Sequence, residues 1–214
     1  MSLKVALNRP AAMSDLSSEM RSIADIGLPP INFPFHDKSL SLLKQTLPTT
    51  ETIGYLVNLS NPIMKTYFDE AQTAANTLGI QLHALNASTL TDVDQVFTTL
   101  AKLRIGAFVV MAEPFLDGHR DKLVELSARY RIAGCYPWRE YVLAGGLMSY
   151  GTNLADSYRQ AGIYAGRILR GETPSNLPVM EPTKFEFVLN LKTAKALSLT
   201  VPPGILSIAD EVIE

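Results

Sequence analysis

The sequence is poor in the residues that support disulfide, metal or redox chemistry. Its 214 residues include one cysteine and three histidines. A single cysteine, Cys135, excludes an internal disulfide, so cysteine content does not identify the compartment. His36, His83 and His119 lack the spacing of zinc ligands. We therefore expect no metal site and no cofactor.

Strong charge and long apolar runs are also missing. Charged residues make up 19% of the chain and the net charge is −2, which does not resemble the electrostatic footprint of a nucleic-acid-binding protein. No apolar run is long enough to cross a bilayer. The first residues, MSLKVALNRPAAMSDLSS, lack the apolar centre of a secretory signal, which indicates either a cytoplasmic protein or a signal already removed.

Catalytic motifs are absent as well. No Gly-x-Gly-x-x-Gly, P-loop or nucleophile elbow follows a predicted strand. Cys135 ends a buried-looking strand and reads as an inert core thiol. Asp117, His119 and Asp121 resemble the acidic first turn of a helix. The sequence predicts no catalytic residues and no enzyme activity, and an enzyme on a flavodoxin-like sheet has only the fold class in its favour.

From Thr52 onward, apolar runs of strand length alternate with amphipathic helical segments. This order predicts an α/β fold, a three-layer α/β/α doubly wound parallel sheet with right-handed crossovers. We expect Ala107–Met111 to be the central strand, because it is the most apolar. The predicted strands are Ile53–Asn58, Ile80–Leu85, Ala107–Met111, Ile132–Tyr136, Leu147–Tyr150 and Phe185–Leu189.

Helix starts are marked by side chains that can accept a hydrogen bond from the first turn. Asn61 precedes Pro62, and Thr91, Asp117 and Asn153 precede the later helices. Apolar stripes at spacings of three and four follow each cap, and the last long one carries Leu154, Tyr158, Ala161, Ala165, Ile168 and Leu169. Further helices are predicted at Met13–Ile26, Lys38–Leu47, Trp138–Leu143 and Leu191–Leu197, with a helical turn after Pro203 and a Pro-rich connector over Thr173–Pro182.

In an open parallel sheet, ligands bind beyond the carboxyl ends of the strands. Asn58, Ser60 and Asn61 would bring amides and a hydroxyl to a helix N-terminus there, a suitable place for a carboxylate. Glu113 would pair with an ammonium group. The aromatic residues Phe115, Tyr136, Trp138 and Tyr150 would form the wall of an apolar pocket.

Each of these residues has a purely structural alternative. Asn61 is also explained as a helix cap alone, since Asn-Pro is common at helix starts. Glu113, before a proline, can face solvent. Tyr136 and Trp138 can pack at a rim without touching a ligand.

Several separate motifs, in one order, resemble the ABC transporter substrate-binding protein family related to tryptophan and tyrosine receptors. The resemblance covers about Lys38 to the end of the chain. It is carried by SLSLLKQTLP (Ser39–Pro48), LVNLSNP (Leu56–Pro62), Glu113-Pro114, REY (Arg139–Tyr141), GGLMSYGTN (Gly145–Asn153), TKFEFVLNLKTAKALSL (Thr183–Leu199) and IADEVIE (Ile208–Glu214).

The resemblance implies a periplasmic-binding-protein type I fold with two α/β lobes and ligand in the cleft between them. On that template, residues 51–145 and 183–214 form the C-terminal α/β lobe, and residues 146–182 form a hinge crossing at Tyr150–Gly151 and a helix of the first lobe. Ligand contacts would fall at Asn58, Ser60, Asn61, Glu113, Trp138 and Tyr150. The implied function is the non-catalytic solute-binding part of an ABC importer, with a small organic molecule such as an amino acid or aromatic compound as ligand and a membrane permease as partner. Family members are periplasmic or lipid-anchored.

The chain departs from the family at its start. A complete first lobe needs roughly 100 residues, whereas about 37 precede the matching region. We therefore expect residues 1–50 to be an incomplete first lobe or a linker. A lobe face left uncovered would favour the alternative function, a degenerate binding-fold protein that acts in assembly or regulation as a homodimer.

Overall fold

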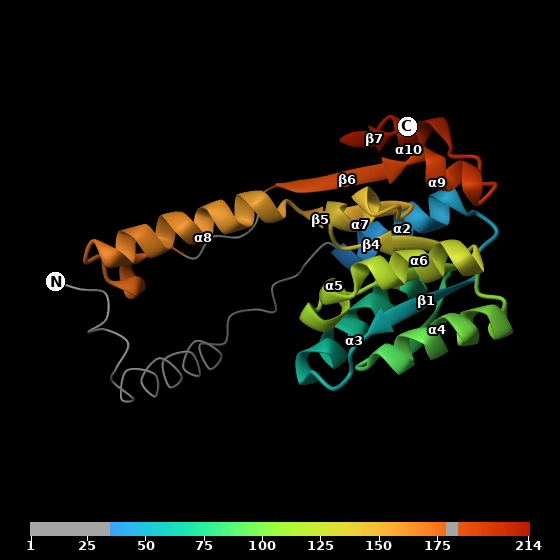
Figure 1. The fold of residues 1–214 in the computed structure, drawn as a ribbon, viewed down its shortest axis with the longest axis horizontal. Coiled ribbons are helices and arrows are strands. Elements are labelled where there is room, and N and C mark those ends of the chain that lie inside the picture. Colours follow the sequence, from blue (N-terminus) through green and yellow to red (C-terminus); the bar gives the residue numbers. More distant parts are fainter. Residues whose placement is uncertain (1–34, 179–183) are drawn as a thin grey trace. The chain divides into compact units, whose positions relative to one another are not determined.

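The computed structural model describes residues 35–178 and 184–214 of the chain. Contacts divide the chain into Met1–Pro34 and a larger compact unit, Phe35–Glu214. The predicted helix Met13–Ile26 and the end of the predicted connector Thr173–Pro182 lie outside the described residues. The fold below is that of the larger unit (Figure 1).

Strands and helices alternate through most of this unit. The order is α2 (Phe35–Thr46), β1 (Thr52–Val57), α3 (Pro62–Thr77), β2 (Gln81–Asn86), α4 (Leu90–Leu103), β3 (Ala107–Val110), α5 (Pro114–Gly118), α6 (Arg120–Tyr130), β4 (Ala133–Tyr136), α7 (Arg139–Leu143), β5 (Met148–Thr152), α8 (Leu154–Leu169), a 3-10 turn (Pro174–Asn176), β6 (Phe185–Asn190), α9 (Leu191–Ala196), α10 (Pro203–Leu206) and β7 (Glu211–Ile213).

The strands form one seven-stranded sheet in the order β2-β1-β3-β4-β5-β6-β7. Strands β1 to β5 are parallel, as predicted. β3 is buried throughout and lies between β1 and β4, in the middle of the five parallel strands, as its apolar sequence predicted; β4 is the middle strand of all seven.

The sheet is parallel at every strand pair except one, which agrees with the predicted doubly wound parallel sheet. β6 runs antiparallel to β5, with Thr152 opposite Phe185, and β7 is parallel to β6. The chain leaves the sheet after β5 and returns beside it, where the Asn153 amide donates to the Lys184 carbonyl. A parallel neighbour would need a crossover over the sheet, and a chain that returns at the same edge is antiparallel instead.

Helices cover both faces of the sheet, which confirms the three-layer α/β/α architecture. On one face α2 packs on β3, β4 and β5 and contacts α3 and α10. On the other face α4 contacts α6, and α6 contacts α7. α2 begins earlier than predicted, and its Leu40, Leu42 and Leu43 are fully buried, so this helix belongs to the α/β body.

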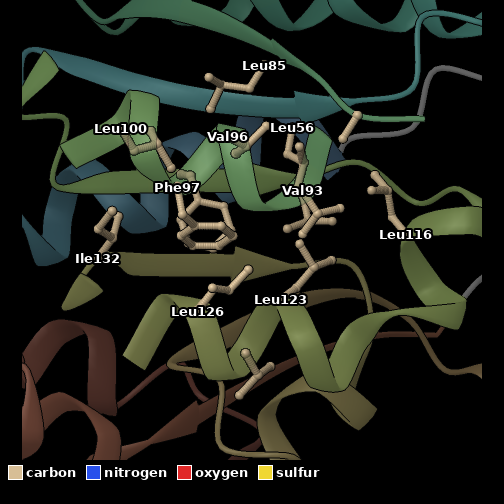
Figure 2. Close-up of a cluster of buried hydrophobic side chains, with 14 of the residues drawn as sticks. Leu56, Leu85, Val93, Val96, Phe97, Leu100, Leu116, Leu123, Leu126 and Ile132 are labelled. Carbon is tan, nitrogen blue, oxygen red and sulfur yellow. The ribbon is translucent and has the colours of Figure 1, made fainter. Parts of the chain in front are cut away.

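The α4–α6 face holds a large cluster of buried apolar side chains (Figure 2). Phe97 of α4 meets Phe108 of β3 edge-to-face at 5.3 Å between ring centroids, and neither side chain is exposed. Full burial of a side chain of this size stabilises the fold by roughly 1.5–3 kcal/mol. This cluster fixes the helices whose ends surround the carboxyl edge of the sheet.

Local signals set the helix starts, with two differences from the prediction. Asn61 caps α3 before Pro62, and Asn153 caps α8 by accepting from the Asp156 amide, as predicted. α4, however, is capped by Thr89 rather than Thr91, because Thr89 and Asp92 exchange hydrogen bonds in a capping box. Asp117 caps no helix: it lies inside α5, and α6 begins after His119.

Candidate functional site at the carboxyl edge of the sheet

The fold brings the carboxyl ends of the first five strands to one edge. Because β1, β3, β4 and β5 are adjacent and parallel, the residues that follow them lie along this edge in the same order. Of the residues that the sequence predicted to contact a ligand, Asn58, Ser60, Asn61, Glu113 and Trp138 lie between elements at this edge, whereas Phe115 belongs to α5, Tyr136 ends β4 and Tyr150 lies in β5. We describe the edge in two parts, the β1–β3 end and the β4–β5 end.

At the β1–β3 end, Asn58 and Glu113 are joined. The Asn58 side-chain amide donates to Glu113 Oε1 at 3.1 Å, and Asn58 Oδ1 accepts from the Ser60 backbone amide. Asn86, at the end of β2, accepts from the Leu59 amide at 2.8 Å. These bonds hold the β1–α3 loop in one conformation.

Glu113 faces inward rather than into solvent. Its side chain caps α5, with Oε2 accepting from the amides of Phe115 at 2.8 Å and Leu116 at 3.2 Å. Together with the bond from Asn58, these donors surround a residue that is only 7% exposed. Glu113 therefore orders the β3–α5 loop, and most of its accepting capacity is already used.

Ser60 and Asn61 lie at the N-terminus of α3. Ser60 is exposed and Asn61 is half-buried, with Asn61 Oδ1 accepting from the Ile63 amide at 3.3 Å. The capping role of Asn61 is thus confirmed. The Asn61 side-chain NH2 group and the Ser60 hydroxyl remain beside the first turn of α3, which is 16 residues long.

At the β4–β5 end, Asp117 links two aromatic side chains. Trp138 Nε1 donates to Asp117 Oδ2 at 3.0 Å, and the Tyr141 hydroxyl donates to Oδ1 at 2.9 Å. Burial raises the pKa of Asp117 above its usual value, against the opposing effect of these two donors. The residue that the sequence assigned to a helix cap instead fixes the Trp138 ring.

A pocket of about 290 Å³ opens beside this network. Its walls come from α5 and the start of α6, from the segment after β4, and from the first turns of α8. The lining residues are Asp117, Arg120, Trp138, Glu140, Tyr141, Leu154 and Tyr158.

A larger hollow of about 410 Å³ lies elsewhere, between α9 and α10. α9 follows β6, which runs opposite to the first five strands, so this hollow lies toward the other edge of the sheet. Its lining mixes apolar side chains with Ser198, Thr200 and Lys195, of which only Lys195 is charged. It lacks the paired acidic and aromatic groups of the smaller pocket.

The aromatic residues predicted to wall the site divide into two groups. Phe115 and Trp138 are half-buried at the edge, and Tyr150 stacks on Phe185 with 5.9 Å between ring centroids. Tyr136 is different, because its ring is fully buried, stacks on Tyr141 at 4.8 Å and meets Phe108 edge-to-face. The prediction of Tyr136 in the ligand-facing wall therefore conflicts with its place in the core.

Sequence reasoning missed most of the residues that line the pocket. Glu140 and Tyr141 belong to the five-residue helix α7, which carries no strong periodic signal, and Arg120 begins α6, outside the apolar stripe by which that helix was predicted. Leu154 and Tyr158 were assigned to an apolar stripe, but α8 has no buried residue and Tyr158 is 74% exposed. The REY run was the one local signal that singled out Glu140 and Tyr141.

The remaining candidates for chemistry do not form a reactive centre. Burial raises the pKa of the Cys135 thiol to about 12, so it stays protonated near neutral pH. Within residues 35–178 and 184–214, no three His, Cys, Asp or Glu side chains group as metal ligands would. In the same part of the chain, no helix combines the length and the apolar character that a membrane crossing requires.

The fold is the mostly parallel α/β fold of the periplasmic-binding-protein type I class. The ABC transporter substrate-binding protein family matches residues 32–213. The chain therefore belongs to this family of substrate-binding proteins.

One curated protein is similar to the chain in sequence. The chain is 23% identical over 163 residues to a tyrosine-binding protein of Clostridioides difficile, covering 76% of this chain and 47% of that protein. It thus spans about half the length of this curated relative.

Two solved structures are similar over 83% of this chain and 60% of their own, each with a TM-score of 0.76. One is a conserved domain protein of Vibrio cholerae, 20% identical, and the other an ABC domain of Streptococcus pneumoniae in complex with L-Trp, 22% identical. A ligand-free, open substrate-binding protein of Clostridium difficile has a TM-score of 0.61 at 24% identity over 83% of this chain and 59% of that one. At these identities the likeness shows the fold.

Proposed function

We propose that this chain is the solute-binding component of an ABC importer and that its ligand is a small organic molecule, an amino acid or an aromatic compound. The supporting observation is the carboxyl edge, where polar loop tips, half-buried aromatic rings and a pocket of about 290 Å³ lie together without a reactive group. The volume is near the lower end of the roughly 300–1,000 Å³ usual for ligand pockets. The ligand is therefore of amino-acid size.

The names of relatives support the amino-acid class. One curated relative is called a tyrosine-binding protein, and one structural relative was solved with L-Trp. Trp138 and Tyr150 offer aromatic surface of the kind that such ligands bury. On this proposal the ligand is passed to a membrane permease, and the protein works outside the cytoplasm, in the periplasm or anchored by lipid.

We propose that the ligand carboxylate lies near Ser60 and Asn61. The N-terminus of α3 carries partial positive charge from its unpaired amides, and the Asn61 NH2 group adds a donor. Asn58 and Glu113 act behind them by fixing the loops. Phe115, Trp138 and Tyr150 would contact the apolar part of the ligand.

The crossing at Tyr150–Gly151 would serve as a hinge toward a second lobe that includes α8. Support comes from α8, which has no buried residue although it is amphipathic. At Gly151 an added Cβ would lie 2.0 Å from the Pro137 carbonyl oxygen, so the crossing runs directly against the chain before Trp138. Closure of a second lobe would remove the ligand from water.

Ligand binding can be tested with Trp138, the single tryptophan of the chain. A panel of amino acids other than tryptophan, with aromatic acids, should contain a compound that changes Trp138 emission. The same compound should raise the melting temperature, because a ligand at 100 times its Kd stabilises by about 2.7 kcal/mol. A Trp138→Phe variant should lose the emission signal while a thermal shift remains, which controls for optical artefacts. Folded protein that responds to no compound, L-tryptophan in the thermal assay included, would rule against the proposal.

A second candidate function is assembly as a homodimer. It is favoured by the exposed apolar side chains of α8, among them Tyr158 at 74% and Leu169 at 87% exposure. Uncovered apolar stripes of this kind are commonly buried by association. Light scattering separates the two: a monomer that responds to ligand supports the receptor, and a tight dimer without a response supports assembly.

A further inference from the structure

Helix α5 lies between the two ends of the carboxyl edge and is bonded to both. Before its first turn, Glu113 accepts at 3.1 Å from the side-chain amide of Asn58, which follows β1. Near its end, Asp117 accepts at 3.0 Å from Trp138 Nε1 and at 2.9 Å from the Tyr141 hydroxyl. Both of these donors follow β4, and α5 itself follows β3. The helix therefore joins loops that come from three neighbouring strands.

Within α5 the two acidic residues are held at a fixed distance from each other. The Glu113 carboxylate accepts from the amides of Phe115 and Leu116, at the start of the helix. The backbone carbonyl of Glu113 accepts from the Asp117 amide at 2.9 Å. Residues four apart in a helix lie on the same face, one turn from each other. A displacement of Glu113 would therefore displace Asp117 as well.

The direction of the Trp138 ring depends on a polar partner. Trp138 is the N-cap residue of the five-residue helix α7, and its half-buried ring packs against the buried cluster of the α4–α6 face. Its side chain has one donor, Nε1–H, and Asp117 accepts it. Tyr141 differs, because it is fully buried and stacks on Tyr136 at 4.8 Å between ring centroids. Packing alone can hold Tyr141, whereas the ring of Trp138 also needs its acceptor.

We infer that Asp117 is a positioning residue for the aromatic wall of the site, and that α5 makes the direction of the Trp138 ring depend on Asn58, at the other end of the edge. Asp117 acts through Trp138, whose ring is the surface on which the apolar part of a ligand packs. A wall that is fixed before binding loses less conformational entropy when the ligand arrives. This inference rests on the proposed function, since it explains how the proposed wall is held in place.

Two variants of Asp117 that differ little in size separate hydrogen bonding from packing. Asp117→Leu removes the acceptor, so the emission of Trp138 should shift to longer wavelength and its quenching by acrylamide should increase. Asp117→Asn keeps an oxygen that accepts from Trp138 and an NH2 group that can donate to the Tyr141 oxygen. It should therefore retain the emission of the unmodified protein. Trp138 is the single tryptophan, so the signal reports on this ring alone.

A variant at Asn58 tests the dependence on the other end of the edge. Asn58→Ala removes the bond to Glu113, and the acrylamide quenching of Trp138 should increase, though by less than in Asp117→Leu. Adding Asn58→Ala to Asp117→Leu should produce no further increase, because the connection that transmits its effect is already broken. Should Asp117→Leu fail to fold by circular dichroism, Asn58→Ala alone still tests the connection.

Asn86→Ala is the matched control for Asn58→Ala. Asn86 holds the same β1–α3 loop, because its side chain accepts from the Leu59 amide at 2.8 Å. Among the described residues, no hydrogen bond joins Asn86 to α5. Asn58 also accepts from the Ser60 amide, so both variants loosen the loop and only one releases α5. Asn86→Ala should leave the emission of Trp138 unchanged.

Ligand affinity connects the position of the ring to function. Isothermal titration calorimetry would use L-tyrosine, L-leucine and any stronger binder from the amino-acid panel. Binding to Asp117→Leu should be about two- to tenfold weaker than to the unmodified protein, the cost of immobilising one side chain on binding. Asp117→Asn should bind as the unmodified protein does.

The possible failures are distinct. If Asp117→Leu and Asp117→Asn leave Trp138 equally accessible to acrylamide, packing alone holds the ring and the inference is wrong. Equal effects of Asn58→Ala and Asn86→Ala would show that α5 does not connect the two ends. If no compound binds to folded protein, the proposed function fails, and the emission measurements, which need no ligand, still decide whether Asp117 positions Trp138. If compounds bind Asp117→Leu with unchanged affinity, the receptor function stands and the positioning role is wrong.

Discussion

α4 and α8 are both amphipathic helices, and they differ in what covers them. In α4 the apolar residues Val93, Val96, Phe97 and Leu100 are all buried against the sheet and α6. In α8 the corresponding stripe has no buried member. An apolar stripe in the sequence therefore indicates an amphipathic helix. It does not indicate which segment, if any, packs against the apolar face of that helix.

Substitutions of Phe97 in α4 and Leu169 in α8 give the largest expected difference between the two helices. Phe97→Ala removes a fully buried ring and should lower the free energy of unfolding by about 3–5 kcal/mol. Leu169→Ala, at a side chain 87% exposed, should change it by less than about 0.5 kcal/mol. Urea denaturation followed by circular dichroism measures both. A comparable loss in the two variants would mean that α8 is packed in solution.

The pH dependence of stability tests whether α2 is packed on the sheet. His36, in α2, is 2% exposed, its Nδ1 lies 2.7 Å from the Tyr55 hydroxyl, and burial lowers its pKa from 6.5 to about 4. The unfolded chain therefore binds a proton more readily than the folded one between these values. The contribution of neutral His36 to the free energy of unfolding is complete above about pH 6.5 and is lost as the pH falls.

Stability should consequently fall by about 2 kcal/mol between pH 7 and pH 5 through this residue. Urea titrations at the two pH values measure the loss. His36→Gln, which cannot titrate, should flatten the difference by a similar amount. An unchanged pH profile in that variant would mean that His36 is not buried as the structure has it.

The helix caps provide a smaller and more local test. Thr89→Ala removes the capping box of α4 and should cost about 1 kcal/mol, because α4 unfolds together with the sheet. Thr91→Ala, at the position that the sequence favoured, should cost much less. Equal losses of stability in the two variants would contradict the assignment of Thr89 as the cap of α4.

The smallest expected effect on unfolding is that of the cap of α8. Asn153→Ala removes the bond from the Asp156 amide at 2.9 Å, but no residue of α8 is buried. We expect fraying of α8, seen as faster amide exchange in Leu154–Leu169, with a change in global stability below about 0.5 kcal/mol. A full cap penalty would show that α8 and the sheet unfold as one unit.

Much of the fold was accessible from the sequence because local signals agreed with one another. The parallel strands β1 to β5, the helices α3, α4, α6 and α7 and the caps Asn61 and Asn153 were predicted to within a few residues, whereas α5 was not predicted as a separate helix. β6 was located, but its direction was not, since a run of apolar residues looks the same in either direction. β7 was missed because a three-residue strand has no period of its own.

The candidate site was less accessible, for a different reason. Topology alone places Asn58, Glu113 and Trp138 on one edge, and that could be anticipated. Side-chain direction could not be: Glu113 turns inward to cap α5, and Tyr136 points into the core. Those choices depend on donors and cavities supplied by other segments.

The sequence by itself determined the alternation of strand and helix, the absence of reactive motifs and the edge of the sheet that we propose for ligand binding. These follow from the 2.0 and 3.6 residue periods and from caps that act within one turn. Only the tertiary structure decided that Asp117 holds Trp138, that Glu140 lines a pocket and that the stripe of α8 is uncovered. Such contacts join residues far apart in the chain, and burial and charge at each depend on everything packed around them.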